Sequence, residues 1–131
     1  METSASSPRK GQRIAGWVIS GLIAAMLLMG VVMSFNPPKE NVEMFTGKFG
    51  YPAETMMPLA IVELLCAILF LVPRTAVLGA VLLTGYLGGA VATHVRVHDN
   101  FIFPIVFGML VWLAVYLREP RVRTVLPLTS A

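Results

Sequence analysis

The stretch that decides the fold is residues 14–35, IAGWVISGLIAAMLLMGVVMSF, which run for 22 residues without a charged side chain. A helix needs about 20 apolar residues to cross the hydrocarbon core of a bilayer. The run follows Arg9, Lys10 and Arg13, as a secretory signal also would, but a signal core has only about 7–15 residues and ends at a small-residue cleavage site. This run is longer and ends at Asn36-Pro37-Pro38. It therefore predicts a retained membrane-spanning helix.

Further apolar runs predict three more helices, and Pro73-Arg74 leaves room for only a tight turn between the second and the third. Short turns between neighbouring helices favour antiparallel packing. The sequence thus predicts an all-α fold, a four-transmembrane-helix antiparallel bundle, with helices over residues 14–35, 56–72, 75–95 and 101–117. We expect a disordered basic tail over residues 1–13, a membrane domain over 14–123 and a C-terminal tail over 124–131.

The composition supports a membrane protein and excludes several other classes. The 131 residues are 56% hydrophobic and 13% charged, whereas an average soluble domain is about 25% charged. Disorder of the whole chain would need low hydrophobicity. The net charge of +3 does not indicate nucleic acid, because the basic residues stand at the ends of apolar runs rather than on one wet face. Cys66 is the only cysteine, so the chain has no dithiol redox pair, and we expect a small buried side chain there.

The basic residues also predict an orientation. With the N-terminus inside, seven of the ten lie on the cytoplasmic side and three outside, which agrees with the positive-inside rule. We therefore expect a multi-pass protein of the plasma (inner) membrane with both termini cytoplasmic. The inner set is Arg9, Lys10, Arg13, Arg74, Arg118, Arg121 and Arg123, and the outer set is Lys39, Lys48 and Arg96.

The first outer loop, residues 36–55, is long for so small a bundle. Val42, Phe45 and Phe49 recur in it at helical spacing beside charged residues. This spacing is typical of a short helix that lies in the membrane interface with its apolar side down. An irregular loop with scattered aromatic residues is the alternative.

Glu63 is the acid placed within a predicted span, and it is the strongest candidate for chemistry. A carboxylate there is costly unless it faces the bundle interior, finds a partner or takes up a proton. Its helical neighbours are small or aromatic, so we expect it to point inward; they are Ala60, Cys66, Ala67 and Phe70. Two interpretations stay open: a proton carrier, and a structural hydrogen bond between the second and third helices.

His94 is the second candidate, because the antiparallel arrangement brings it to about the depth of Glu63. A direct or water-bridged Glu63–His94 contact would be an acid–base pair or a structural clamp. Thr93 and Arg96 would complete a polar cluster, and Tyr86 would line the same interior. Glu63, His94 and His98 form only a weak candidate set of metal ligands, so we expect no bound metal. We expect no haem either.

Gly85 and Gly89 form a G-x-x-x-G pair in the third predicted helix, with Gly88 beside them. Small residues allow close helix approach in lipid. We expect this stripe to pack within the bundle rather than to form a homodimer.

Ordered landmarks along the chain resemble the DoxX-like family of small four-span membrane proteins. They are Phe49-Gly50-Tyr51-Pro52, Ile61-Val62-Glu63-Leu64-Leu65, Leu71-Val72-Pro73-Arg74-Thr75-Ala76, Gly79-Ala80-Val81-Leu82-Leu83, Gly85-Tyr86-Leu87-Gly88-Gly89-Ala90 and Thr93-His94-Val95-Arg96. The resemblance implies a four-helix membrane bundle with Glu63 and His94 where the family pattern carries Glu and His. Members of the wider group are linked to thiosulfate:quinone oxidoreduction and to membrane complexes of oxidative stress. This chain lacks a redox cysteine pair, so thiol chemistry does not carry over.

These observations lead to three functional hypotheses. The first is an accessory or redox-linked membrane subunit that binds a small apolar or quinone-like molecule, with a membrane or redox protein as a partner besides the lipid bilayer. The second is a membrane enzyme of the isomerase or hydrolase type with Glu63 and His94 as its catalytic acid–base pair. The third is a structural or chaperone-like protein without a ligand. The candidate ligand-binding residues are Glu63, Tyr86, Thr93, His94 and Arg96.

Overall fold

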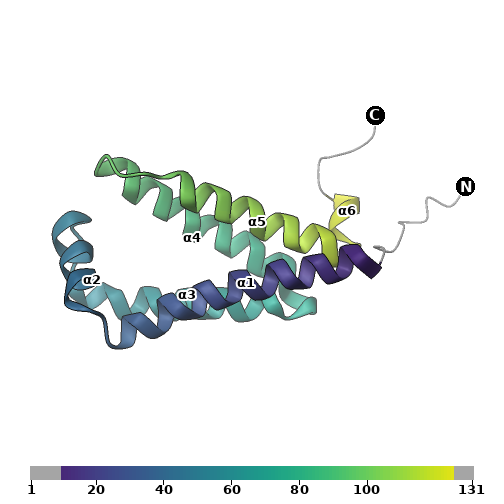
Figure 1. Cartoon of the computed structure of the whole chain (residues 1–131), viewed down its shortest axis with the longest axis horizontal. Coiled ribbons are helices and arrows are strands. Elements are labelled where there is room, and N and C mark those ends of the chain that lie inside the picture. Colours follow the sequence, from purple (N-terminus) through teal and green to yellow (C-terminus); the bar gives the residue numbers. More distant parts are fainter. Residues whose placement is uncertain (1–9, 126–131) are drawn as a thin grey trace, which may run out of the picture.

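The computed structural model describes residues 10–125, and within them all regular structure is helical. The long helices are α1 (Lys10–Phe35), α3 (Met56–Leu71), α4 (Ala76–Arg96) and α5 (Ile102–Arg118). Each packs against two others, in the order α1, α3, α4, α5 and back to α1. The chain reverses direction at every connection (Figure 1). The predicted all-α antiparallel bundle is confirmed.

Three helical segments of the described part are long and apolar enough to cross a membrane, namely Lys10–Phe35, Ala53–Leu71 and Pro73–Arg96. The first and the third have only 28% of their most apolar window buried, and the second 22%. Most of their apolar surface therefore faces outward, as lipid contact requires. The fourth long helix, α5, is apolar but has 17 residues.

The three later spans lie within one residue of the expected bounds, and larger differences occur at the two ends of the described chain. The helix α1 begins at Lys10 rather than at Ile14, because Lys10, Gln12 and Arg13 are good helix formers and continue it by one turn. At the other end α6 (Val122–Val125) extends into the expected C-terminal tail, where fully buried Val122 joins the core. The remaining predicted tail residues, 1–9 and 126–131, lie outside the described residues.

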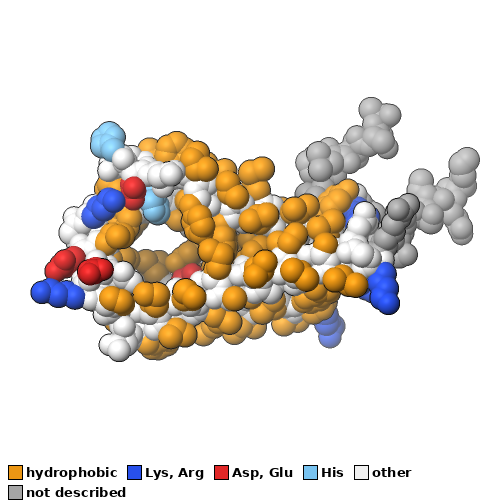
Figure 2. All heavy atoms as spheres, viewed as in Figure 1, with side chains coloured by type: hydrophobic (Ala, Val, Ile, Leu, Met, Phe, Trp, Pro, Cys, Tyr) orange, Lys and Arg blue, Asp and Glu red, His pale blue; other side chains and the backbone are white. Residues whose placement is uncertain are grey.

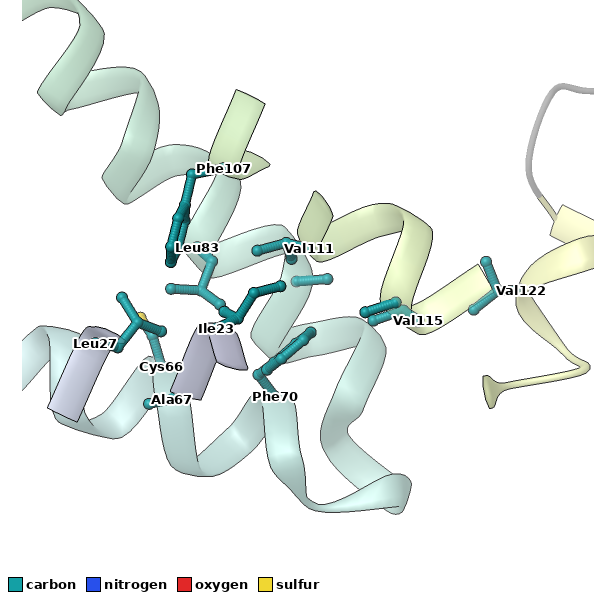
Figure 3. Packing of buried hydrophobic residues seen from close by; sticks show 12 residues of the cluster. Ile23, Leu27, Cys66, Ala67, Phe70, Leu83, Phe107, Val111, Val115 and Val122 are labelled. Atoms are coloured by element: carbon teal, nitrogen blue, oxygen red, sulfur yellow. The ribbon is translucent and has the colours of Figure 1, made fainter. Parts of the chain in front are cut away.

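The bundle is wedge-shaped. Figure 1 shows the α1/α3 pair and the α4/α5 pair close together where α1 begins and α5 ends, and apart at the opposite end, where α2 (Lys39–Glu43) lies. The buried hydrophobic cluster fills the narrow part, with Phe70, Leu83 and Val111 at its centre (Figure 3). The packed core therefore lies toward one end of the bundle.

Two glycines allow the close approach at the narrow end. A Cβ at Gly79 in α4 would collide with the backbone of Phe70 in α3, and one at Gly16 in α1 would lie 2.9 Å from the backbone nitrogen of Arg118. By contrast, a Cβ at Gly85 or Gly89 would meet no atom within 4 Å. The expected packing of the Gly85–Gly89 stripe is therefore wrong, because the α4/α5 pair has already diverged from the α1/α3 pair there (Figure 1).

Arg118 ties three helices together at the narrow end. Its side chain is buried (2% exposed), Nη1 donates to Ser20 Oγ of α1 at 2.9 Å, and Nη2 donates to the carbonyl of Phe70 in α3. The guanidinium carbon lies 4.5 Å from the ring centre of Trp17 and 4.6 Å from that of Phe70. Aromatic faces attract the cation, so Arg118 holds α1 and α3 to the end of α5.

We expect Arg118→Ala to destabilise the bundle by about 2–4 kcal/mol. The substitution removes the packing of the side chain and its hydrogen bonds to the Phe70 carbonyl and to Ser20. Arg118→Lys should restore only part of this stability, since an ammonium cannot stack or bridge as a guanidinium does. Thermal unfolding in detergent measures both. Arg121→Ala, at an exposed residue of the same segment, is the matched control. Equal melting temperatures for the Arg118 and Arg121 variants would contradict the clamp.

The glycine contacts give a second prediction. Alanine normally stabilises a helix interior by up to about 1 kcal/mol over glycine, and Gly21→Ala, which meets open space, should be neutral or stabilising. Gly79→Ala should instead lower the melting temperature, because the methyl group forces α3 and α4 apart. If both variants have the same melting temperature in detergent, α3 and α4 are not in backbone contact at Gly79 as described.

Candidate functional site

The open end of the bundle contains three adjoining cavities. The side cavity (about 330 Å³) lies between α1, α4 and α5 and reaches α3. The cover cavity (about 450 Å³) lies between α4, α3 and residues 45–51. The end cavity (about 350 Å³) lies between α1, α3 and residues 41–49 and reaches α4. Tyr86 lines all three, Glu63 lines the side and end cavities, and His94 lines the side and cover cavities. Figure 2 shows the hollow, with acidic atoms visible inside it. Three predicted site residues therefore surround one region.

Glu63 lies inside the bundle, as expected. Tyr86 donates a hydrogen bond from its hydroxyl to Glu63 Oε2 at 3.3 Å. Glu63 Oε1 lies 3.2 Å from where a Cβ at Gly30 would be, so the carboxylate reaches across to the bare backbone of α1. The four residues expected on its inward face are the buried residues of α3, namely Ala60, Cys66, Ala67 and Phe70.

His94 forms a local hydrogen bond. Its Nδ1 lies 2.7 Å from the carbonyl oxygen of Ala90, which can only accept, so Nδ1 carries a proton. In the uncharged ring Nε2 is then an acceptor. The ring also packs on Phe49, with 5.2 Å between ring centres.

Glu63 and His94 line the same side cavity. Within residues 10–125, however, the hydrogen-bond partner of Glu63 is Tyr86 and that of His94 is Ala90. The direct pair considered from the sequence is therefore absent. The Glu63–Tyr86 bond joins α3 to α4, as the structural interpretation of Glu63 requires.

Thr93 and Arg96 hold residues 44–51, here called the cover segment, against α4. Thr93 Oγ1 donates to Gly89 at 2.8 Å, so the 2.5 Å contact with Tyr51 has the tyrosine hydroxyl as donor. Arg96 donates from Nη2 to the carbonyl of Phe49 and lies 5.4 Å from the ring centre of Tyr51. Thr93 lines the cover cavity, whereas Arg96 acts outside the three cavities.

An ion pair at the surface completes these attachments. Lys48 Nζ lies 3.1 Å from Asp99 Oδ2 in the turn after α4. The ammonium of Lys48 and the backbone N–H of Asn100 hold the pKa of Asp99 below its ordinary value. The pair is therefore kept at neutral pH and is lost only as the pH falls through that lowered value.

The predicted helix in the first loop is present as α2 and the π-helix Met44–Lys48. Its aromatic residues Phe45 and Phe49 line the cover and end cavities, so they face the bundle rather than the interface expected for them. Tyr51 stacks on Phe45 at 5.2 Å. The cover segment thus forms an aromatic wall of these cavities. The spacing of its apolar residues predicts that they share one face of a helix, but not whether that face is turned to the membrane interface or to the bundle.

Sequence reasoning missed the role of Gly30 and assigned Gly85 and Gly89 to packing. In the structure Gly85 and Gly89 line the cover cavity, and the absence of side chains there leaves the space open. His98 lies in the α4–α5 turn with a φ of 60°. No group of three metal-ligating side chains was found in the described part of the chain.

We expect Arg96→Ala to loosen the cover segment, because it removes one hydrogen bond and one cation–π contact. A net loss of about 1 kcal/mol would speed amide hydrogen exchange in residues 44–51 about fivefold. Arg74→Ala, in the turn at the other end of α4, is the control and should leave this exchange unchanged. Unaltered exchange in the Arg96 variant would mean that other contacts hold the cover.

Comparison with known proteins agrees with this architecture. The model of the DoxX-like family matches residues 18–114, which include Glu63, Tyr86 and His94. No curated protein and no solved structure gives a significant match. Because the family match covers most of the chain and the long helices are apolar enough to cross a bilayer, this transmembrane protein belongs to the DoxX-like family.

Proposed function

We propose that this protein binds a small apolar or quinone-like molecule in the cavities around Glu63, Tyr86 and His94, and that it acts as an accessory or redox-linked membrane subunit. The observation that carries the proposal is the convergence of these three side chains, from α3 and α4, on adjoining cavities.

The size and lining of the cavities support ligand binding. Sites for small molecules measure about 300–1,000 Å³ and combine mostly apolar walls with a few polar groups. Each of the three cavities lies within this range. The polar groups of the side cavity are Glu63, Tyr86 and His94, and its other lining residues are apolar.

The proposal includes a placement in the plasma membrane with four spans and both termini cytoplasmic. At 1.5 Å per residue, the 17 residues of α5 reach about 25 Å, which suffices for a thin or locally adapted bilayer. Arg13, Arg74 and Arg121 lie at the end of the bundle where α1 begins and α5 ends, and Lys48 and Arg96 lie at the other end. The bias agrees with the positive-inside rule.

The two other hypotheses make different demands on the same residues. An acid–base enzyme needs a substrate or water that bridges Glu63 and His94 across the side cavity. A purely structural protein needs only the Tyr86–Glu63 bond between α3 and α4. Hydrogen bonds between membrane helices contribute about 0.6 kcal/mol on average, so removal of this bond should leave the bundle folded.

The test is native mass spectrometry of the detergent-purified full chain, with Glu63→Gln and Tyr86→Phe beside the unaltered protein. We expect a copurifying small molecule in the unaltered chain, at least a fivefold lower occupancy in both variants, and melting temperatures within a few degrees. Glu40→Gln, an exposed acid of α2 outside the cavities, is the control and should keep the occupancy.

Two results would contradict the proposal. One is full occupancy in both variants, which would place the molecule elsewhere. The other is an empty protein whose variants lose only stability, which would favour the structural hypothesis.

A further inference from the structure

The polar atoms around the side cavity are arranged to accept hydrogen bonds. The Tyr86 hydroxyl donates its hydrogen bond to Glu63 Oε2, so the hydroxyl oxygen can still accept one. Glu63 Oε1 has no hydrogen-bond donor among the described residues and faces the backbone of Gly30. His94 donates its Nδ1 proton to the carbonyl of Ala90, so in the uncharged ring Nε2 is an acceptor. With Glu63 ionised and His94 uncharged, a ligand that satisfies these three groups must bring a donor.

The same cavity extends from these groups to the apolar surface of the bundle. Met26 of α1 and Phe103 of α5 line it, and both are exposed, at 48% and 62%. The other residues that line the cavity, apart from Glu63, Tyr86 and His94, are apolar, among them Leu27 and Phe107. Met26 lies within the longest apolar span, so the opening between α1 and α5 faces lipid acyl chains rather than water.

From this arrangement, and resting on the proposed function, we infer that the ligand is a lipid-soluble amphiphile whose neutral polar end donates a hydrogen bond, as a phenol or an alcohol does. Its polar end lies at Glu63, Tyr86 and His94, and its apolar chain extends between Met26 and Phe103. The ligand enters the site laterally from the bilayer, between α1 and α5. For a quinone-like molecule, the inference selects the hydroxyl-bearing reduced form over the carbonyl form, which has only acceptors.

An anionic headgroup does not fit this site. A carboxylate or phosphate would meet the carboxylate of Glu63 in surroundings of low dielectric constant, where like charges repel strongly. A methyl ether of the same shape as a phenol would leave the acceptors without a donor. Hydrogen bonds to charged groups contribute about 1.5–3 kcal/mol, so removal of the donor should weaken binding about tenfold or more.

The experiment uses the full chain in nanodiscs of phosphatidylcholine. The probe is a 4-alkylphenol with a photoreactive diazirine at the far end of its chain, and mass spectrometry locates the label. The competitors are 4-octylphenol and 4-octylanisole, in which a methyl group replaces the hydroxyl hydrogen and so removes the donor. We expect labelling near Met26, Phe103 or Phe107, and 4-octylphenol should compete at about one tenth of the concentration that 4-octylanisole needs.

A matched pair of variants tests the path. Met26→Trp narrows the opening and should reduce labelling at least fivefold. Met29→Trp, on the same helix and 65% exposed but outside the residues that line the side cavity, should leave labelling unchanged. Melting temperatures of both variants show that they are folded.

Each contrary result has a distinct meaning. Equal competition by the phenol and its ether, with label in the side cavity, would overturn the donor requirement and leave the proposed function standing. Competable label confined to the cover segment, or equal labelling of the two tryptophan variants, would overturn the sideways path. Absence of competable label anywhere, while the purified chain still carries its own small molecule, would overturn the amphiphile. An absence of both would remove the proposed function as well.

Discussion

The close contact of backbones at the narrow end is the constraint on which the rest of the structure depends. Gly79 brings α4 onto the backbone of Phe70, and Gly16 brings α1 onto that of Arg118. Straight helices that meet so closely at one end diverge toward the other when larger residues or open space separate them there. The cavities are thus a consequence of where the small residues pack. The site at the open end depends on a seam at the opposite end of the molecule.

The charged groups inside the bundle make their hydrogen bonds with neutral partners rather than with opposite charges. Arg118 lies between two aromatic rings and donates to a hydroxyl and a carbonyl, while Glu63 accepts from a phenol. Ion pairs taken out of water pay a large desolvation cost, which their attraction often fails to recover. The described part of the chain has its one ion pair, Lys48–Asp99, at the surface. Glu63 therefore keeps its acceptor capacity, since no buried cation neutralises it.

Much of the fold could be predicted from the sequence, because charge-free runs of spanning length leave few alternatives. The inward face of Glu63 also followed from its small neighbours. The sequence could not show which glycines pack, since Gly79 and the Gly85–Gly89 stripe are equally small and only the tilt of α4 separates them. It placed Arg118 only among the basic residues of the cytoplasmic side. The burial of Arg118 beneath Trp17 depends on a contact between residues about one hundred positions apart in sequence, which local patterns do not encode. The position of the cover segment over the cavities likewise depends on contacts with residues far away in sequence, Thr93 and Arg96.

The opening between Met26 and Phe103 has a consequence for affinity. A site that communicates with acyl chains responds to the mole fraction of its ligand in the bilayer, not to its concentration in water. Each methylene of an apolar chain favours the membrane by about 0.8 kcal/mol, so even a short chain concentrates a scarce compound many thousandfold around the protein. The pocket itself then needs only modest affinity to be filled. Selectivity among lipid-soluble compounds falls to the few polar atoms at its inner end.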